Sequence, residues 1–172
     1  MDAFECSHPS VERRMSDWIR ILRSAFVSGT AASITSTIAL ALVARAEGKA
    51  ASQPINATSH WLNGNQAGSF KGVDIAHTAV GYATHHAANV FWAVLFEWWI
   101  GERRPLPPLE LFQRALATSV LAAAVDYGAT PKRLTPGWEL VLTKRSMAVA
   151  YGAMAVGLAL GAVALQGRQT QL

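Results

Sequence analysis

The chain has 172 residues, of which 51% are hydrophobic and only 15% are charged, whereas an average soluble protein has about 25% charged residues. Its formal net charge is +4, but the basic residues lie beside hydrophobic runs, which suits anionic lipid headgroups better than nucleic acid. The lone Cys6 excludes an internal disulfide and a cysteine-based metal site. We therefore expect the lipid bilayer, and not nucleic acid, as a partner.

The N-terminal segment, residues 1–23, combines a polar tail with a predicted basic amphipathic helix. Its apolar residues recur on one helical face, with arginines around them: Met15, Trp18, Ile19, Leu22 and Phe26. Such a helix can lie in the membrane interface. It can equally be a solvated extension of the first spanning helix, and the sequence leaves both open.

The first predicted span covers residues 24–44, which contain no charged side chain and reach the roughly 20 residues that cross a bilayer. The run is too long for the apolar core of a signal peptide, so we expect an uncleaved anchor. Small residues recur at every fourth position and predict close helix packing: Gly29, Ser33, Thr37 and Ala41. In the loop that follows, residues 54–65 predict a short helical turn closed by Gly64.

The second predicted span, residues 75–100, carries most of the polar groups and ends at Trp98 and Trp99, a typical interfacial aromatic pair. Ionisable groups at membrane depth usually face a protein interior or a wet cavity. We therefore expect this helix to be central, with His85 and Asn89 facing the first and third spans and bonding to hydroxyl groups of the first. The predicted intramembrane polar cluster comprises His77, Tyr82, His85, His86, Asn89, Glu97 and Asp126.

The third predicted span, residues 109–129, reaches bilayer length only by including Arg114 and Asp126. The alternative is an interfacial or re-entrant segment. A short proline-rich turn precedes it, so the second and third spans should be antiparallel neighbours. We expect Asp126 and Tyr127 to anchor basic residues of the connector, 130–145.

The fourth predicted span, residues 146–165, contains Gly157 and Gly161 in a GxxxG packing motif, which indicates either an intrachain contact or a dimer face. A short C-terminal tail, 167–172, follows. The sequence thus predicts an all-α integral membrane bundle of four transmembrane helices, covering 24–166, with an N-terminal amphipathic helix.

Four functions are compatible with this pattern. The leading hypothesis is a non-enzymatic scaffold or accessory subunit, alone, as a homo-oligomer or in a larger membrane complex, whose polar groups tie the helices together. The alternatives are a small transporter or proton-conducting oligomer, a haem- or metal-binding subunit, and an interfacial enzyme acting on lipid or quinone. The histidine spacing argues against a metal site, and no nucleophile motif is present, so we predict no catalytic residue, no metal and no cofactor.

Two stretches, HTAVGYATHHAANVFWAVLFE and VDYGATPKRLTPGWE, resemble a set of small bacterial inner-membrane proteins without assigned chemistry. A weaker similarity is to the DUF1440 (YagU-like) group. The resemblance implies a multi-pass helical bundle in the inner (cytoplasmic) membrane and assigns no site residue. Lys and Arg number eight on one predicted side and seven on the other. The arginines before the first span favour cytoplasmic termini.

Overall fold

The computed structural model describes residues 9–101 and 103–169, and within these residues it contains helices and turns but no strand. The predicted all-α class is therefore confirmed. The four long helices are α1 (Pro9–Ala46), α4 (Val80–Gly101), α5 (Pro108–Gly128) and α6 (Lys144–Gln169). The short elements are α2 (Gln53–Thr58), α3 (His60–Asn63), η1 (Asn65–Ser69), η2 (Ile75–Ala79), η3 (Lys132–Leu134) and η4 (Trp138–Leu140).

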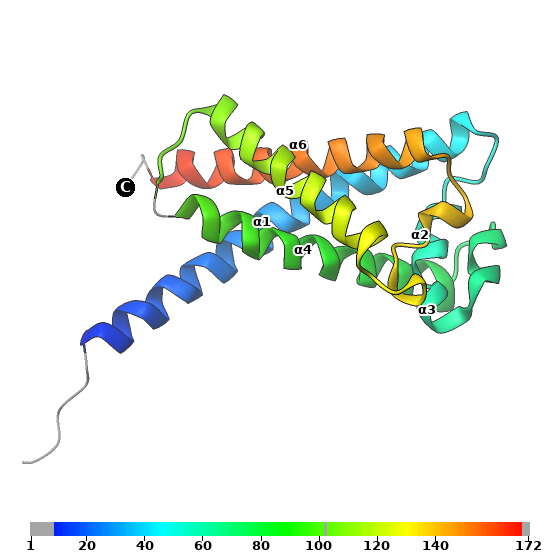
Figure 1. Ribbon diagram of the computed structural model, residues 1–172, viewed down its shortest axis with the longest axis horizontal. Helices are drawn as coiled ribbons and strands as arrows, with labels where there is room; N and C mark the ends of the chain where they lie inside the picture. The colour runs from blue at the N-terminus through cyan, green and yellow to red at the C-terminus, as the bar shows by residue number, and fades with distance from the viewer. Residues whose placement is uncertain (1–8, 102, 170–172) are drawn as a thin grey trace, which may run out of the picture.

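The long helices run in alternating directions, and the short elements gather at one end of the bundle (Figure 1). At this end α2, α3 and η1 lie near the 3-10 turns of the connector between α5 and α6. We call residues 47–74 and 129–143 together the cap. The most extensive pairing is between α1 and α6, and α1 also packs along α4. The prediction that the second span is the central helix is therefore wrong, because α1 occupies that position.

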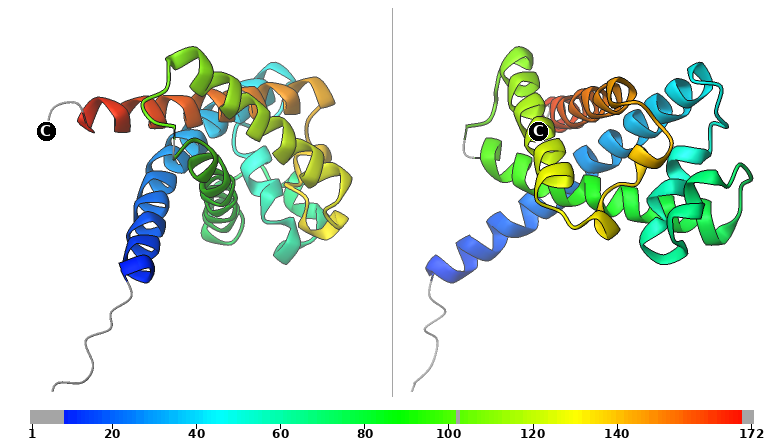
Figure 2. Two further views of the ribbon diagram at one scale, coloured as in Figure 1. Left: turned by 60° about the vertical axis from the view of Figure 1, so that its left-hand side comes forward. Right: turned by 45° about the vertical axis from the view of Figure 1, so that its right-hand side comes forward.

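The first helix is continuous from Pro9 to Ala46. No break separates the predicted amphipathic segment from the predicted first span, so this segment is an extension of the span. It projects beyond the bundle (Figures 1 and 2) and leaves Trp18 and Leu22 about half exposed. The described part of the predicted segment is residues 9–23; residues 1–8 and the tail residues 170–172 lie outside the description.

Small residues allow α1 to approach two helices closely. A Cβ atom on Gly161 of α6 would lie 2.5 Å from the Ser28 Cα, and one on Gly29 would lie 2.7 Å from the Val90 Cα in α4. The GxxxG motif of Gly157 and Gly161 thus makes an intrachain contact with α1. The Thr35 hydroxyl reinforces it by donating to the Ala153 carbonyl oxygen at 2.7 Å.

The bundle buries polar side chains in its interior beside apolar ones, and it exposes many large apolar side chains. Serine, histidine and asparagine side chains are buried between the helices, for example Ser33, His85 and Asn89. Large apolar side chains face outward along all four long helices: Ile34, Ile38, Leu42, Phe91, Leu116, Val120, Val156 and Leu160. Monomeric soluble proteins rarely expose apolar surface of this extent. Two described helical stretches, 14–46 and 144–167, are long and apolar enough to cross a membrane.

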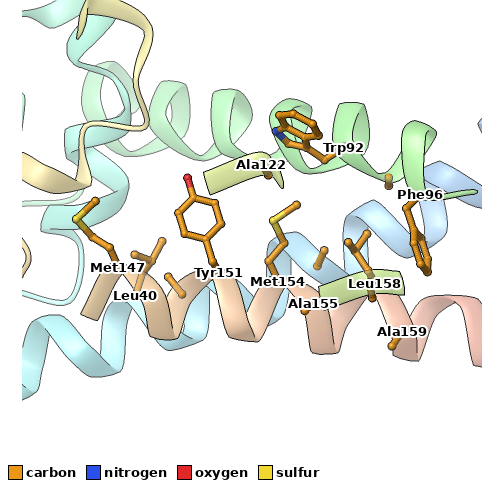
Figure 3. Packing of buried hydrophobic residues seen from close by; sticks show 14 of the residues in the cluster. Leu40, Trp92, Phe96, Ala122, Met147, Tyr151, Met154, Ala155, Leu158 and Ala159 are labelled. Atoms are coloured by element: carbon orange, nitrogen blue, oxygen red, sulfur yellow. The ribbon is translucent and has the colours of Figure 1, made fainter. Parts of the chain in front are cut away.

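The apolar interior fills the space between α1, α4 and α6. Phe96 and Leu158 are fully buried there, as is Leu40 nearer the cap (Figure 3). Tyr151 extends from α6 and its hydroxyl points away from that helix (Figure 3). This ring separates the apolar interior from the cavity described below.

Glu47 joins the C-terminal end of α1 to the N-terminal end of α6 at the cap end of the bundle. Its carboxylate accepts hydrogen bonds from the hydroxyls of Ser146 and Thr143, at the N-terminus of α6. These bonds hold the pKa of Glu47 below its usual value. A carboxylate is also favoured at the positive end of a helix dipole.

The glycine contact gives a direct test of the packing. Gly157→Ala should destabilise the protein by about 1–3 kcal/mol, because a new methyl group would overpack the contact with α1. Gly152→Ala is the control, since a Cβ atom there meets nothing within 4 Å. It should be neutral or stabilising by up to about 1 kcal/mol through helix propensity. Thermal unfolding in mild detergent measures both. Equal stability of the two variants, with a changed oligomer mass for Gly157→Ala, would instead indicate a dimer face.

Candidate functional site

A cavity of about 260 Å³ lies where the cap meets the helices. Its walls come mainly from α4 and α6, with one residue each from α1 and α5, and its roof comes from the cap. The lining is mainly apolar and aromatic, and a few polar groups converge on it. The wall residues include Ser36, Thr84, His85, Ala88, Asn89, Trp92, Asp126 and Tyr151. The roof residues include Thr58, Trp61, Leu134, Thr135 and Trp138.

The roof is held by close backbone contacts and by hydrogen bonds across the cap. Gly81 lets α2 approach α4, since a Cβ atom there would clash with the Ile55 carbonyl. Gly137 has φ +79°, a left-handed conformation that favours glycine, and it lies against the Ala57 carbonyl. The Trp138 indole N–H donates to Thr58 Oγ1 at 3.2 Å. Residues far apart in the sequence therefore form one rigid cover.

The short helical turn predicted for 54–65 is present as α2 and α3, and α3 ends at Gly64 with φ +75°. Asn56, the first residue of an Asn-Ala-Thr sequon, is fully buried. Its amide nitrogen donates to the carbonyl oxygens of Phe70 and Gly72, and its oxygen accepts from Thr78. Asn56 therefore organises the cap and is closed to modification in the folded protein.

One polar wall of the cavity joins α1 and α4. The His85 Nε2 atom lies 3.0 Å from Ser36 Oγ, which is the contact with a first-span hydroxyl that the sequence predicted. Ser36 donates its own hydrogen to the Ala32 carbonyl at 2.6 Å, so the imidazole donates to Ser36. Asn89 lies one turn further along α4 and donates to the His85 carbonyl oxygen at 2.8 Å. His85 and Asn89 are both 4% exposed.

A second polar group lines the cavity from α5 and α6. The Tyr151 hydroxyl donates to Asp126 Oδ2 at 2.7 Å. The prediction that Asp126 and Tyr127 anchor basic residues of the connector is wrong, because none of the ion pairs among the described residues includes Asp126. The connector folds over α4 and places Arg133 against the Trp61 carbonyl instead.

Aromatic rings form much of the remaining surface. The ring centroids of Trp138 and Tyr151 are 5.3 Å apart, and those of His85 and Trp138 are 5.7 Å apart. Trp61 and Trp92 also line the cavity. Trp138 and Tyr151 were missed as site residues from sequence. The only available signal was their aromatic character, which is equally typical of packing.

The predicted intramembrane polar cluster separates into four groups. In η2, just before α4, His77 Nδ1 lies 2.9 Å from Asp74 Oδ2, and the hydrogen bonds of His77 lower the pKa of Asp74. Tyr82 and His86 stack on each other with centroids 6.1 Å apart, outside the cavity. His85, Asn89 and Asp126 line the cavity.

Glu97, in the last turns of α4, pairs with Arg104. It is 2% exposed and is not part of the cavity. Within the predicted cluster, Tyr82 does not share the buried position of His85 and Asn89, because it is 38% exposed. In the described part of the chain, no three His, Cys, Asp or Glu side chains are placed to hold one metal ion.

Comparison with protein-family models, curated proteins and solved structures found no match to this chain.

The two aromatic-polar residues of α4 make a matched pair for testing the site. His85→Ala should cost about 1–3 kcal/mol, because it leaves buried partners without their hydrogen bonds. Tyr82→Ala removes a larger but partly exposed ring and should change stability by only about 0.5 kcal/mol. Denaturation in detergent micelles compares them. A larger loss for Tyr82→Ala would contradict the assignment of His85 to the interior.

Proposed function

We propose that all four long helices span a bacterial inner membrane, with the termini in the cytoplasm. Helices α4 and α5 have 22 and 21 residues, which correspond to about 31–33 Å at 1.5 Å per residue and match the roughly 30 Å hydrocarbon core. Their exposed apolar residues, such as Phe91 and Val120, continue the outward-facing surface of α1 and α6. The bacterial location is supported by the resemblance of the two sequence stretches quoted above.

The four-span arrangement makes a specific topology prediction. In a chain whose Cys6 is replaced by serine, Lys49→Cys and Lys132→Cys should react with an impermeant maleimide from the periplasmic side, because both lie in the cap. Arg103→Cys, between α4 and α5, should react only after the membrane is opened. All three positions are exposed. If Arg103→Cys reacts together with the other two in intact cells, only α1 and α6 cross the membrane.

We further propose that the protein is a non-enzymatic accessory membrane protein that binds a small apolar molecule taken from the bilayer. The observation that carries this proposal is that Ala88 of α4 both lines the cavity and is exposed. If α4 spans the membrane, an exposed lining residue at this depth opens the cavity sideways toward lipid. Exposed Trp61 and Leu134 of the cap edge the same cavity. Apolar, concave sites with a few convergent polar groups are typical of ligand binding.

The dispersal of the polar residues favours binding over proton conduction. His85 and Glu97 are twelve residues apart on α4, which is about 18 Å by helical rise. Each is engaged with a different partner, Ser36 for His85 and Arg104 for Glu97. A relay through both residues would need intermediate groups. Of the buried α4 positions between them, only Asn89 beside His85 is polar, and the others are Trp92, Ala93 and Phe96.

A bulky side chain introduced at the opening of the cavity tests the binding function. A fatty alcohol carrying bromine on its chain should quench tryptophan fluorescence when bound, since Trp61, Trp92 and Trp138 line the cavity. Ala88→Phe should raise the Kd of the probe, measured from this quenching, at least about tenfold, a cost of about 1.4 kcal/mol, because the new ring fills the space. Ala87→Phe is the control, because Ala87 is exposed on the same helix but does not line the cavity. Equal quenching in both variants would show that the probe reports only detergent contact.

A further inference from the structure

The hydrogen-bond donors around the cavity are already engaged within the protein. Thr84 Oγ1 donates to the Val80 carbonyl at 2.9 Å and accepts from the Trp61 indole at 3.2 Å. The hydroxyls of Ser36 and Tyr151 donate as described above. The Thr58 hydroxyl donates to the Pro54 carbonyl oxygen, and the Thr135 hydroxyl donates to the Glu139 carboxylate at 2.5 Å. The Trp92 indole is the exception among the lining side chains. The cavity therefore offers a ligand mainly acceptors.

Asn89 supplies the clearest free acceptor. Its Oδ1 atom is buried and has no hydrogen-bond partner among the described residues. The residue is 4% exposed and lines the cavity. The amide orientation is set by its nitrogen, which donates to the His85 carbonyl, a group that can only accept. An unpaired buried acceptor costs about 1–3 kcal/mol. A ligand that donates a hydrogen bond here removes that penalty.

Asp126 adds a carboxyl group to the same cavity. Among the described residues, its only hydrogen-bond partner is the Tyr151 hydroxyl, which is a neutral donor. Arg133 of the connector donates its Nε–H to the Trp61 carbonyl, and neither it nor Lys132 pairs with Asp126. A carboxylate in a largely apolar wall is unfavourable unless a cation accompanies it.

The aromatic walls suit the same ligand. Trp61, Trp92, Trp138 and Tyr151 all line the cavity. The faces of tryptophan and tyrosine rings attract cations, and aromatic sites bind organic ammonium groups for this reason. An apolar ligand alone would use the rings but leave the carboxylate and the Asn89 oxygen unsatisfied.

We propose that the cavity binds a lipophilic amine in its protonated form. The ammonium group is recognised by Asp126, Asn89 and the aromatic rings, and the apolar part lies toward the opening at Ala88. This assignment rests on the proposed binding function and names the chemical class of its ligand. It distinguishes an ammonium from a neutral alcohol of the same length.

The test is a competition in neutral maltoside micelles at pH 8, where an alkylamine, like lysine with its pKa of about 10.4, is protonated. Dodecylamine and dodecanol each displace the bromine-labelled alcohol from the full-length protein. The wild type should bind dodecylamine about 10- to 100-fold more tightly than dodecanol, the range expected for a hydrogen bond between charged groups. Asp126→Asn should remove most of this preference and leave dodecanol binding unchanged. Glu110→Gln is the control, since it removes a charge near the other end of α5, outside the cavity.

The outcomes separate the two proposals. If neither compound displaces the probe, the binding function itself fails. If both displace it equally from the wild type, the cavity binds apolar molecules but the ammonium assignment is overturned. The assignment is also overturned if the preference persists in Asp126→Asn, or if Glu110→Gln lowers it as much, because the charge effect would then come from the protein or micelle surface. Retained dodecanol binding shows that the Asp126→Asn protein is folded.

Discussion

The structure depends on the close approach of α1 to two helices at once. Gly161 meets Ser28 on one side of α1, and Gly29 meets Val90 on the other. Between helices in lipid there is little hydrophobic driving force, so close backbone packing by small residues supplies much of the association. Because α1 holds both α4 and α6, α5 packs mainly on α6 and only sparsely on α4. The packing of α4 on α6 is also sparse, which leaves room for a cavity between these two helices beneath the cap.

The cap converts that room into a defined site. Gly81 and Gly137 bring the segments before α4 and before α6 into contact, and the Trp138 indole is fixed by Thr58. Since the lining hydroxyls donate to carbonyl and carboxylate oxygens inside the protein, the surface left to a ligand is rich in acceptors and aromatic faces. The chemistry of the cavity thus follows from which way the internal hydrogen bonds point.

The ionisable side chains inside the bundle have different polar partners. Glu97 pairs with Arg104, and His85 donates to Ser36. Asp126 is different, because its partner is the neutral Tyr151. Burying a charge without an opposite charge is costly in a membrane. This difference marks the cavity as the place where the protein has retained an unbalanced group, and it distinguishes a site from simple interhelical packing.

The sequence alone determined that four long helices are present and where the third one begins and ends, because uncharged runs of bilayer length and the proline-rich turn are local signals. The predicted third span, 109–129, differs from α5 by one residue at each end. The sequence also predicted that His85 meets a hydroxyl of the first span, since the direction in which a side chain leaves a helix follows from helical periodicity. Only the tertiary structure decided that α1 continues through residue 23, that Tyr82 is exposed, and that Asp126 meets Tyr151. A helical projection gives the direction of a side chain but not the neighbour that covers it, which depends on helix crossing and on the path of the cap.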